Sequence, residues 1–439
     1  MEEQRSSVPE KAKQEREIPS HWAWVEPLVW TDKMLAALER GVKGGKWFSL
    51  IDKVWYLPNL ESAWKQVAAN RGSAGIDNIS IKHYRRHAAE RLNRTSELLR
   101  QNKYHPAGVK RVWIDKAGSK DKRPLGIPTV TDRVVQTALR NVIEPIFERE
   151  FCEYSYGFRP RRSCKDALRR VDGLLKQGYR YVVDADIKGY FDNIPQDKLM
   201  LLIENKIADS RILALLNSYL SQKVIDTAAS WTPEAGTPQG AVISPLLANI
   251  YLDPLDWLML KERYQMTRYA DDFVVQCKTE TEATLALETI RIWTLEAGLT
   301  LHPTKTKIVD TETDIFEFLG YKFKKGMKFP SDKSIKKLRD NIRKHTKRSN
   351  AHSLQTIINR ITPIQRGWFE YFKHAHRNSF PEQDSWVRRR LRSILKKHEK
   401  RRGIATNHKD NQRYPNAIFD SRGFFSMVKA HSELCQSLT

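Results

Sequence analysis

The 439-residue chain is poor in cysteine and has no long apolar run. Its four cysteines are scattered with no Cys-x-x-Cys pair, which speaks against a zinc site or a disulfide framework and favours a reducing compartment. No apolar stretch approaches the ~20 residues that cross a bilayer, and the charged N-terminus lacks the features of a secretory signal. The sequence therefore predicts a cytoplasmic protein with no membrane partner.

Acidic residues are also in deficit, at 52 Asp and Glu against 76 Lys and Arg. The net charge of +24 indicates a polyanionic partner, most simply a nucleic acid. Residues 321–410 hold 26 Lys and Arg against 7 Asp and Glu, so 19 of the 24 charges lie in one fifth of the chain. A generic solvated surface would mix the two signs more evenly.

The length allows roughly three domains, and the 40% apolar content with 12 Trp, 15 Tyr and 16 Phe indicates globular structure. The first 50 residues are expected to start disordered and then pack on the main body. Periodicity predicts helices at 60–68, 83–99, 132–149, 163–175, 199–220, 246–260 and 281–297. Strands are expected at 109–114, 181–186, 301–309 and 315–323, and in a pair around 269–272. This order predicts an α+β sheet layered with helices, followed from 329 onward by an all-helical region.

Two adjacent carboxylates, Asp271 and Asp272, stand between the aromatic Tyr269 and an apolar β-branched run. A strand pair folded around them would put both at a hairpin tip. Taken alone, this is an ordinary solvated turn, because Asp is a common turn residue. The alternative is a divalent metal that relieves the repulsion between the two carboxylates.

A third carboxylate changes the balance. The apolar strand from Tyr181 ends at Asp186, where either Asp184 or Asp186 could simply cap the strand. Asp186 together with Asp271 and Asp272 on neighbouring strands would instead hold two Mg²⁺ ions, with Mn²⁺ able to substitute. One ion would activate a 3′-hydroxyl and the other would neutralise a triphosphate, as in two-metal phosphoryl transfer.

Two basic segments leave alternatives open. The loop from Lys116 to Arg123 is either solvated or a cationic hairpin that closes on a triphosphate. The helical region after Phe329 is either a bundle with a solvated exterior or a surface that follows a phosphate backbone, which its self-repelling run from Arg388 to Arg392 favours.

Seven short motifs in order carry a family resemblance. They are Gly-Ser-Ala-Gly-Ile-Asp, Arg-Pro-Leu-Gly-Ile-Pro, Tyr-Gly-Phe-Arg-Pro, Asp-Ile-Lys-Gly-Tyr-Phe-Asp, Pro-Gln-Gly with Ser-Pro-Leu-Leu-Ala-Asn-Ile, Tyr-Ala-Asp-Asp and Phe-Leu-Gly-Tyr. From about residue 60 to 402 the chain resembles the bacterial group II intron reverse transcriptase/maturase family. The resemblance implies a right-hand polymerase with an antiparallel-sheet palm and a basic helical thumb, called domain X in maturases.

The same resemblance implies the roles of single residues. Asp186, Asp271 and Asp272 correspond to the catalytic aspartates. The expected metal ligands are Asp186, Asp271 and the carbonyl of Ile187, while Asp272 is expected to support the metal site with less direct contact to the metal. The expected nucleotide-binding residues are Lys116, Arg123, Phe191, Gln239 and Lys305. Among these, Phe191 is the steric gate against a 2′-hydroxyl and Lys305 a general acid for the leaving pyrophosphate. The primer grip is expected at Phe318, Leu319 and Gly320, and RNA binding at Lys336, Lys337, Arg343, Arg388, Arg389, Arg390 and Arg392.

Several further expectations follow from this resemblance. The domains would be an N-terminal extension (1–50), fingers (51–180), palm (181–328), thumb (329–410) and C-terminal tail (411–439). The partners would be intron RNA, an RNA template with a DNA or RNA primer, dNTPs and target DNA, in association with the bacterial nucleoid. With no zinc-binding endonuclease domain after the thumb, the chain resembles compact members that take a primer elsewhere, for example at a replication fork.

The sequence differs from the family pattern in two respects, and two alternative functions remain open. Ala241 replaces the second glycine of the family's Pro-Gln-Gly-Gly turn, and the first 50 residues have no clear counterpart. One rival is a domesticated reverse transcriptase used in phage defence or beside a CRISPR system. The other is a splicing-only RNA chaperone whose polymerase site is a relic.

Overall fold

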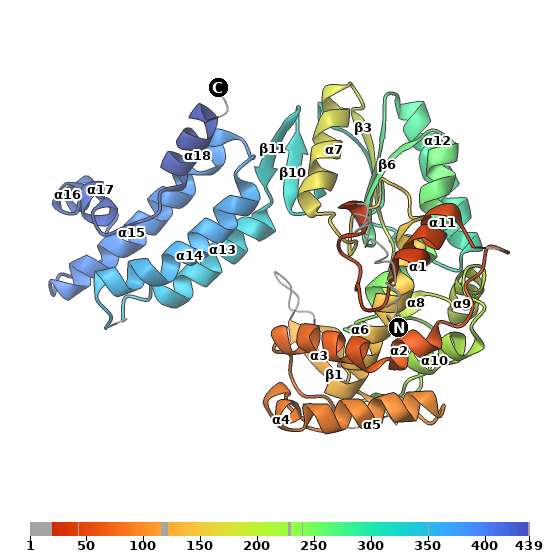
Figure 1. The fold of residues 1–439 in the computed structure, drawn as a ribbon. Coiled ribbons are helices and arrows are strands. Elements are labelled where there is room, and N and C mark those ends of the chain that lie inside the picture. The colour runs from red at the N-terminus through yellow and green to blue at the C-terminus, as the bar shows by residue number, and fades with distance from the viewer. Residues whose placement is uncertain are drawn as a thin grey trace, which may run out of the picture.

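A mixed α/β body carries an all-helical arm at its C-terminal end (Figure 1). The structure, a computed structural model, describes residues 20–42, 44–115, 122–226, 230–238, 240–349 and 351–437. The body helices are α1 (Asp32–Arg40), α2 (Ile51–Trp55), α3 (Leu57–Ala69), α4 (Ile81–Arg86), α5 (Ala88–Arg100), α6 (Val130–Glu148), α7 (Cys164–Lys176), α8 (Tyr190–Asn193), α9 (Gln196–Glu204), α10 (Ser210–Leu220), α11 (Ser244–Lys261) and α12 (Glu280–Glu296). The arm consists of α13 (Asp332–His345), α14 (Leu354–Phe372), α15 (Pro381–His398), α16 (His408–Arg413), α17 (Asn416–Asp420) and α18 (Met427–Gln436).

The central sheet has the strand order β6-β7-β3-β8 and is antiparallel throughout. Its strands are β3 (Tyr181–Asp186), β6 (Gln265–Tyr269), β7 (Asp272–Cys277) and β8 (Lys307–Asp310). Because side chains alternate along a strand, Val183 and Val275 enter the core with α11 and α12, whereas Val182 and Val274 enter the core shared by α7 and the arm. Asp186 and Asp272 are an even number of residues from Val182 and Val274, so they lie on the face of the sheet that α7 covers.

Two further sheets lie outside the central one. The first has the order β2-β1-β4-β5 and is formed by β1 (Val109–Asp115), β2 (Lys122–Ile127), β4 (Val224–Ile225) and β5 (Ser230–Trp231). The second has the order β11-β10-β9, formed by β9 (Phe316–Phe318), β10 (Tyr321–Lys324) and β11 (Met327–Pro330), and it joins the body to the arm (Figure 1).

The helix positions agree with the sequence periodicity, but three expected elements are interrupted and a fourth is shorter than expected. The helix predicted at 83–99 is divided at His87, whose φ of −124° is not helical. The helix predicted at 199–220 is two helices, because Asp209 caps a new one by accepting bonds from the N–H groups of Arg211 and Ile212. The strand predicted at 315–323 is a hairpin that turns at Leu319 and Gly320, and the one predicted at 301–309 begins only at Lys307.

Both ends of the described part of the chain pack on apolar cores. Trp22 and Trp30 are buried in the main core of the body, as expected for the segment that precedes residue 50, while residues 1–19 lie outside the described part. At the other end, Phe419 and Met427 are buried in the core of the arm. Asp384 of α15 accepts a 2.7 Å hydrogen bond from Ser426, so residues 411–437 are packed structure and not a loose tail.

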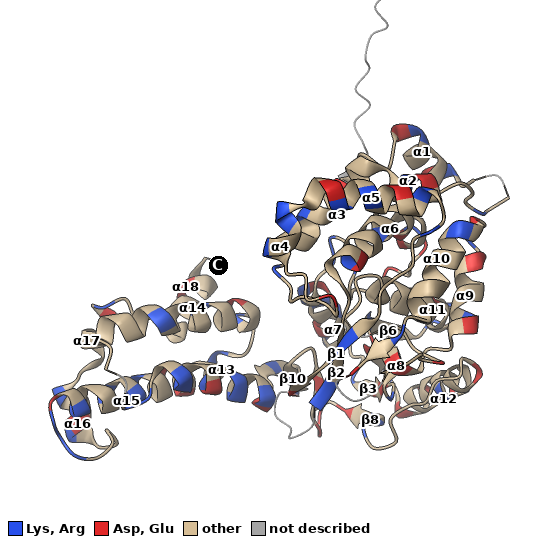
Figure 2. Ribbon diagram, turned by 90° about the horizontal axis from the view of Figure 1, so that it is seen from below, with Lys and Arg blue, Asp and Glu red and all other residues tan. Residues whose placement is uncertain are grey.

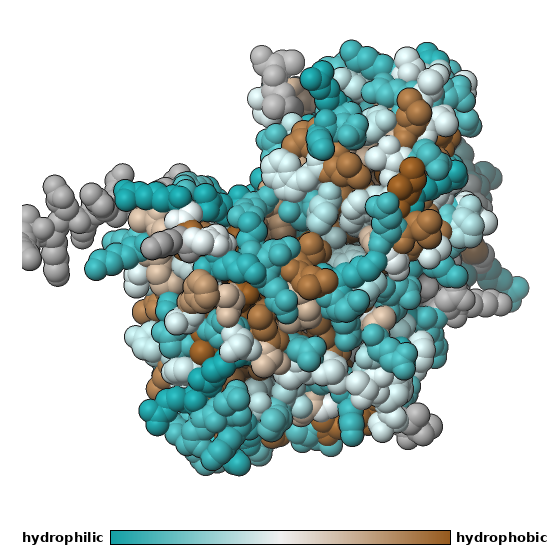
Figure 3. Space-filling view, turned by 90° about the vertical axis from the view of Figure 1, so that its right-hand side faces the viewer, coloured by the Kyte–Doolittle hydropathy of each residue, from teal (hydrophilic) through white to brown (hydrophobic). Residues whose placement is uncertain are grey.

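Basic residues recur along the arm helices and are interspersed with fewer acidic ones (Figure 2). The opposite side of the molecule, which carries α9 and α12, is mostly hydrophilic with separate apolar areas (Figure 3). Exposed Leu201, Leu285, Ile292 and Leu295 belong to these two helices. Among the described residues, no helix combines the length and apolarity needed to cross a membrane.

Candidate active site

Strand pairing brings the three expected carboxylates together at one end of the central sheet. Asp186 ends β3 and lies directly opposite Asp272, the first residue of β7. Asp271 and Ala270 form the two-residue turn between β6 and β7. Ala270 has a φ of 60°, a left-handed conformation that is uncommon for a residue with a Cβ atom.

Burial and mutual repulsion penalise the charged forms of these carboxylates. Burial raises the pKa of Asp271, and the neighbouring Asp186 adds to the effect. The pKa of Asp272 is raised to about 7 by burial and then by Asp184 and Asp271. The pKa of Asp184 is raised to about 6, mainly by burial, although Lys307 opposes the shift. Such a cluster needs positive charge before all its members can ionise near neutral pH.

The donor set fits a divalent cation at Asp186 and Asp271. These two carboxylates, with the carbonyl of Ile187, are hard oxygen donors of the kind that Mg²⁺ prefers. The described residues contain no group of three or more His, Cys, Asp and Glu side chains already gathered as a metal centre. Asp186 is instead paired with Lys305, whose Nζ lies 2.5 Å from its Oδ2. Asp272 differs from the other two, because the backbone N–H of Leu319 lowers the pKa of its carboxyl and so opposes the effect of burial.

A buried arginine is hydrogen-bonded to the turn that carries Asp271. Arg268 is fully buried in β6, and its Nη1 donates 2.9 Å hydrogen bonds to the carbonyl oxygen of Ala270 and to Oδ1 of Asn249. Its Nε and Nη2 bind the carboxylate of Asp256 in α11, with a shortest distance of 2.5 Å. The guanidinium charge is therefore compensated inside the core, while one N–H remains for the turn.

Gly157 packs closely against the backbone of the same turn. Its carbonyl oxygen accepts a 2.8 Å hydrogen bond from Asn249. A Cβ atom at this position would overlap the backbone nitrogen of Ala270, so only glycine allows this approach. The preceding residue, Tyr156, donates its N–H to the carbonyl oxygen of Arg268 at 2.9 Å.

Sequence reasoning did not assign Arg268, Asn249 or Asp256 to the site, and it quoted Gly157 only as part of a motif. One signal was available. Arg268 is a charge within an expected strand and Asp256 is a charge within an apolar helix, and such residues are seldom buried unless they are paired.

The expected nucleotide-binding residues are only partly described. Lys116 and Gln239 lie outside the described residues. Arg123 is exposed on β2, and Phe191 is half-buried in α8, where its carbonyl oxygen accepts a 2.7 Å bond from the N–H of Thr237. This bond fixes the loop that precedes residue 239 against α8.

The departure at Ala241 has a simple structural basis. Ala241 is buried and donates its N–H to the carbonyl oxygen of Pro238 at 3.0 Å. Its φ is not positive, unlike that of Gly240 at 102°, so the turn requires glycine at position 240 and not at 241.

The expected primer-grip residues form the turn between β9 and β10. Phe318 is buried, while Leu319 and Gly320 have φ values of 48° and 78°. The turn packs against the arm, because Ser331 donates its N–H to the carbonyl oxygen of Gly320 at 2.8 Å. The N–H of Leu319 also lowers the pKa of Asp272.

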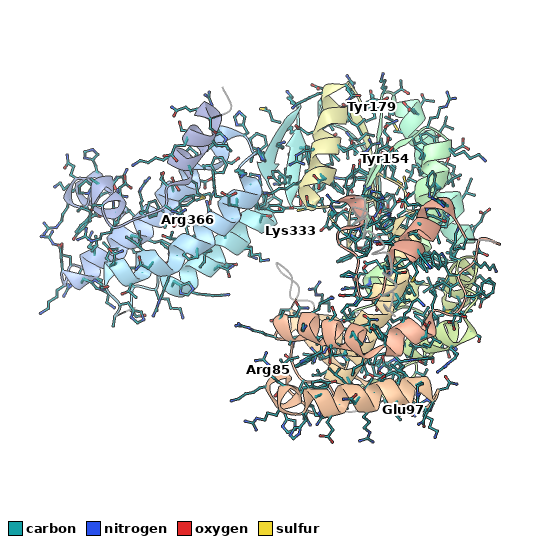
Figure 4. The ribbon with its side chains drawn as sticks, viewed as in Figure 1. Arg85, Glu97, Tyr154, Tyr179, Lys333 and Arg366 are labelled. Atoms are coloured by element: carbon teal, nitrogen blue, oxygen red, sulfur yellow. The ribbon has the colours of Figure 1, made fainter. Side chains whose placement is uncertain are left out.

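The seven expected RNA-binding residues divide into two groups. The side chains of Lys336, Lys337, Arg343 and Arg389 are exposed, although Arg343 also pairs with Asp340 of the same helix. The remaining three are engaged within the arm: Arg388 pairs with Asp420, Arg390 binds Thr346 at the end of α13, and Arg392 is 8% exposed with bonds to Tyr414 and Asn416. Arg366 of α14 and Lys333, at the start of α13, show how the arm carries further basic side chains (Figure 4).

Comparison with known families identifies both parts of the molecule. Residues 114–323, which hold all three carboxylates, match the family described as "Reverse transcriptase (RNA-dependent DNA polymerase)". Residues 335–414 match the "Group II intron, maturase-specific domain". The chain belongs to the group II intron reverse transcriptase/maturase family.

The chain is also similar to individual proteins. The group II intron-encoded protein LtrA of Lactococcus lactis subsp. cremoris is 41% identical over 208 residues, which are 47% of this chain and 34% of LtrA. Protein YkfC of Escherichia coli (strain K12) is 33% identical over 288 residues, 56% of this chain and 75% of YkfC. A protein in the cob intron of Schizosaccharomyces pombe is 31% identical over 65% of this chain and 46% of its own length. The match thus spans about a third of the length of LtrA.

Proposed function

We propose that the chain is an RNA-directed DNA polymerase that also acts as the splicing maturase of a group II intron. The observation that carries the proposal is the meeting of Asp186, Asp271 and Asp272 at one end of an antiparallel sheet, within the matched reverse transcriptase region. The adjoining basic helices match the maturase-specific domain and supply the RNA-binding part. We assign fingers to 51–180, palm to 181–328 and the thumb to the helical region from 329.

The chemistry proposed is in-line transfer of a nucleotide from a dNTP to a primer 3′-hydroxyl. Asp186 and Asp271, with the carbonyl of Ile187, would hold the divalent ions, which we take to be two Mg²⁺. When bound, these ions supply the charge neutralisation that phosphoryl transfer requires. The 2.5 Å contact between Lys305 and Asp186 supports a role for this lysine beside the proposed metal site, where it would donate a proton to the leaving pyrophosphate.

The remaining groups bind and orient the substrates. Arg123, together with Lys116, would neutralise the triphosphate, and Gln239 would contact the incoming nucleotide. Phe191 would exclude a 2′-hydroxyl because its half-buried ring has little freedom to move aside. Phe318, Leu319 and Gly320 would place the primer end next to the carboxylates.

The RNA partners are proposed from charge. The exposed cations Lys336, Lys337, Arg343 and Arg389 would contact the phosphate backbone of the intron RNA, the RNA template or target DNA. A splicing-only chaperone with a relic polymerase site is less well supported, because none of the three aspartates is replaced.

The test is primer extension on an RNA template by the purified chain, with RNA affinity measured in parallel. The wild-type chain should incorporate dNTPs in the presence of Mg²⁺, and Asp271→Ala should lose this activity while RNA binding stays nearly unchanged. Full activity in Asp271→Ala would contradict the metal-site assignment. Loss of RNA binding in the same variant would point to misfolding and not to chemistry.

A further inference from the structure

The turn between β6 and β7 has a backbone conformation that its own residues do not favour. In a two-residue hairpin turn whose first residue alone has a positive φ, that residue is normally glycine. Here it is Ala270, with a φ of 60°. A Cβ atom makes this left-handed region unfavourable, so contacts from outside the hairpin must hold the turn in place.

Asn249 of α11 bonds two neighbours of this turn at once. Its Nδ2 donates a 2.8 Å hydrogen bond to the carbonyl oxygen of Gly157. Its Oδ1 accepts a 2.9 Å hydrogen bond from Nη1 of Arg268. The orientation of the amide follows from these partners, because a carbonyl oxygen only accepts and a guanidinium only donates. The side chain is buried, so water does not compete for either bond.

The two neighbours reach Ala270 at different atoms. Gly157 packs against its backbone nitrogen, while Nη1 of Arg268 donates a 2.9 Å hydrogen bond to its carbonyl oxygen. Asn249 and Asp256 are about two helical turns apart on α11 and so share one face. Asp256 binds Nε and Nη2 of the guanidinium, and Asn249 binds one N–H of Nη1. The other N–H of Nη1 is thereby directed at the turn.

We propose that Asn249 is a positioning residue that fixes the backbone of Ala270, and through it the carboxylate of Asp271. It directs the guanidinium N–H at the Ala270 carbonyl and holds Gly157 against the Ala270 nitrogen. Asn249 acts through these two neighbours and not through the substrates. The inference rests on the proposed function for its effect on metal binding and catalysis, whereas the hydrogen bonds themselves are independent of that function.

The test compares variants of two buried asparagines in the full chain. Asn249→Leu keeps the approximate volume of the side chain and removes both hydrogen bonds. Asn249→Asp keeps the acceptor for Arg268 and removes the donor to Gly157. Asn59→Leu is the matched control, because Asn59 is also buried and its Nδ2 donates to backbone carbonyl oxygens of α2 and α6, at 2.8 and 3.1 Å, and not to the turn or its neighbours.

The first readout is the affinity for Mn²⁺ without nucleotide, measured by electron paramagnetic resonance of the free ion. Asn249→Leu should raise the Mn²⁺ dissociation constant about 10- to 100-fold, the usual effect of losing a group that orients a metal ligand, and Asn249→Asp should raise it by a smaller factor. Both leucine variants should lower the thermal unfolding midpoint, because each leaves buried polar groups without a partner. Asn59→Leu should nevertheless keep the Mn²⁺ dissociation constant within about twofold of the wild-type value, because its lost bonds do not orient a metal ligand.

The second readout is primer extension with Mg²⁺. Asn249→Leu should lower kcat about 10- to 100-fold and change KM for dNTP by less than about threefold, because the turn carries a metal ligand and not the nucleotide-binding residues. All measurements are made below the unfolding midpoint of each variant, and if Asn249→Leu does not fold, Asn249→Asp decides alone.

Wild-type Mn²⁺ affinity in the folded Asn249 variants, or an equal loss of affinity in Asn59→Leu, would overturn the proposal. A wild-type chain that binds Mn²⁺ but incorporates no dNTP would refute the proposed polymerase, while the Mn²⁺ comparison would still decide the role of Asn249.

Discussion

Gly157 lies so close to Ala270 that a Cβ atom on the glycine would overlap the backbone nitrogen of the alanine. The two residues are 113 positions apart in the sequence. Their contact nevertheless fixes the position of the turn that carries Asp271. Asn249 strengthens it by bonding both the Gly157 carbonyl and the Arg268 guanidinium. The turn is thus enclosed by a buried polar network and not exposed at a free hairpin tip.

Gly157→Ala should therefore impair catalysis more than folding. The added methyl group must displace the turn, and a shift of about 1 Å at a reacting centre can cost on the order of 10²-fold in rate. Single-turnover primer extension measures the loss. Gly173→Ala is the matched control, because nothing lies within 4 Å of its Cβ position, and alanine should stabilise helix α7 by about 0.5–1 kcal/mol without loss of activity. Equal rates in the two variants would contradict the proposed role of Gly157.

Phe191→Val should weaken the selection against ribonucleotides. A smaller side chain removes the expected clash with a 2′-hydroxyl, so the ratio of kcat/KM for rNTP to that for dNTP should rise at least about 10-fold. Competition between labelled dGTP and GTP on one RNA template measures the ratio. An unchanged ratio, with normal dNTP incorporation, would assign the steric gate to another residue.

Glu144 should make stability depend on pH. Burial raises its pKa to about 7 from 4.5, and repulsion by Glu148 adds to the effect although Arg140 opposes it. A raised folded-state pKa means that the folded chain binds this proton more tightly than the unfolded chain, so the contribution to stability is present below about pH 4.5 and is lost as the pH rises through about 7.

Glu144→Gln removes this titration and should stabilise the chain at pH 8 by roughly 1–3 kcal/mol. The advantage should disappear near pH 4.5, where the wild-type side chain is also neutral. Denaturant unfolding of both chains at the two pH values measures it. A difference that does not change with pH would show that Glu144 is already neutral, or already paired, at pH 8.

Exposed and buried cations of the arm should behave differently. The triple variant Lys336→Gln, Lys337→Gln, Arg389→Gln should weaken RNA binding. The slope of the logarithm of the binding constant against the logarithm of the salt concentration should become shallower by about one unit for each of these residues that touches a phosphate. Arg392→Gln should instead lower the thermal unfolding midpoint, because it leaves the Tyr414 carbonyl and Asn416 without their partner. Equal salt slopes in the wild type and the triple variant would place the RNA elsewhere.

Deletion of the arm is not a clean test of RNA binding, because the arm shares a core with the central sheet. Val182 and Val274 of the central sheet share a core with α14 and α15. Deletion of the residues from Ser331 onward would expose that core, so substitution of single exposed cations is the cleaner test of RNA binding.

The sequence predicts those parts of the site that depend on local pattern. Asp186 at the end of an apolar strand and Asp271 within an expected hairpin were both identified from their neighbours, and strand pairing brings them together. What the sequence could not predict depends on pairing between distant segments. The contact of Gly157 with Ala270 and the bond from Tyr371 to Leu319 have no signal in periodicity or composition, since each joins residues from different elements.

The basic helices show a similar limit. Arg388, Arg389, Arg390 and Arg392 belong to one run of charge and look equivalent in the sequence. The structure distinguishes the exposed Arg389 from the other three, because Thr346 and the segment 414–420 provide internal acceptors for their guanidinium groups. Composition shows that a segment is basic, but only packing shows which cations remain free to bind a phosphate.

The central claim is that Asp186 and Asp271 hold the catalytic metal ions, with Asp272 in a supporting position. The measurement is the single-turnover rate of primer extension at saturating Mg²⁺ for Asp186→Asn, Asp271→Asn and Asp272→Asn, with RNA affinity as the control for folding. The account predicts a fall of at least about 10³-fold for the first two and a smaller fall for Asp272→Asn, each with RNA affinity preserved. Extension at the wild-type rate by Asp271→Asn would contradict it.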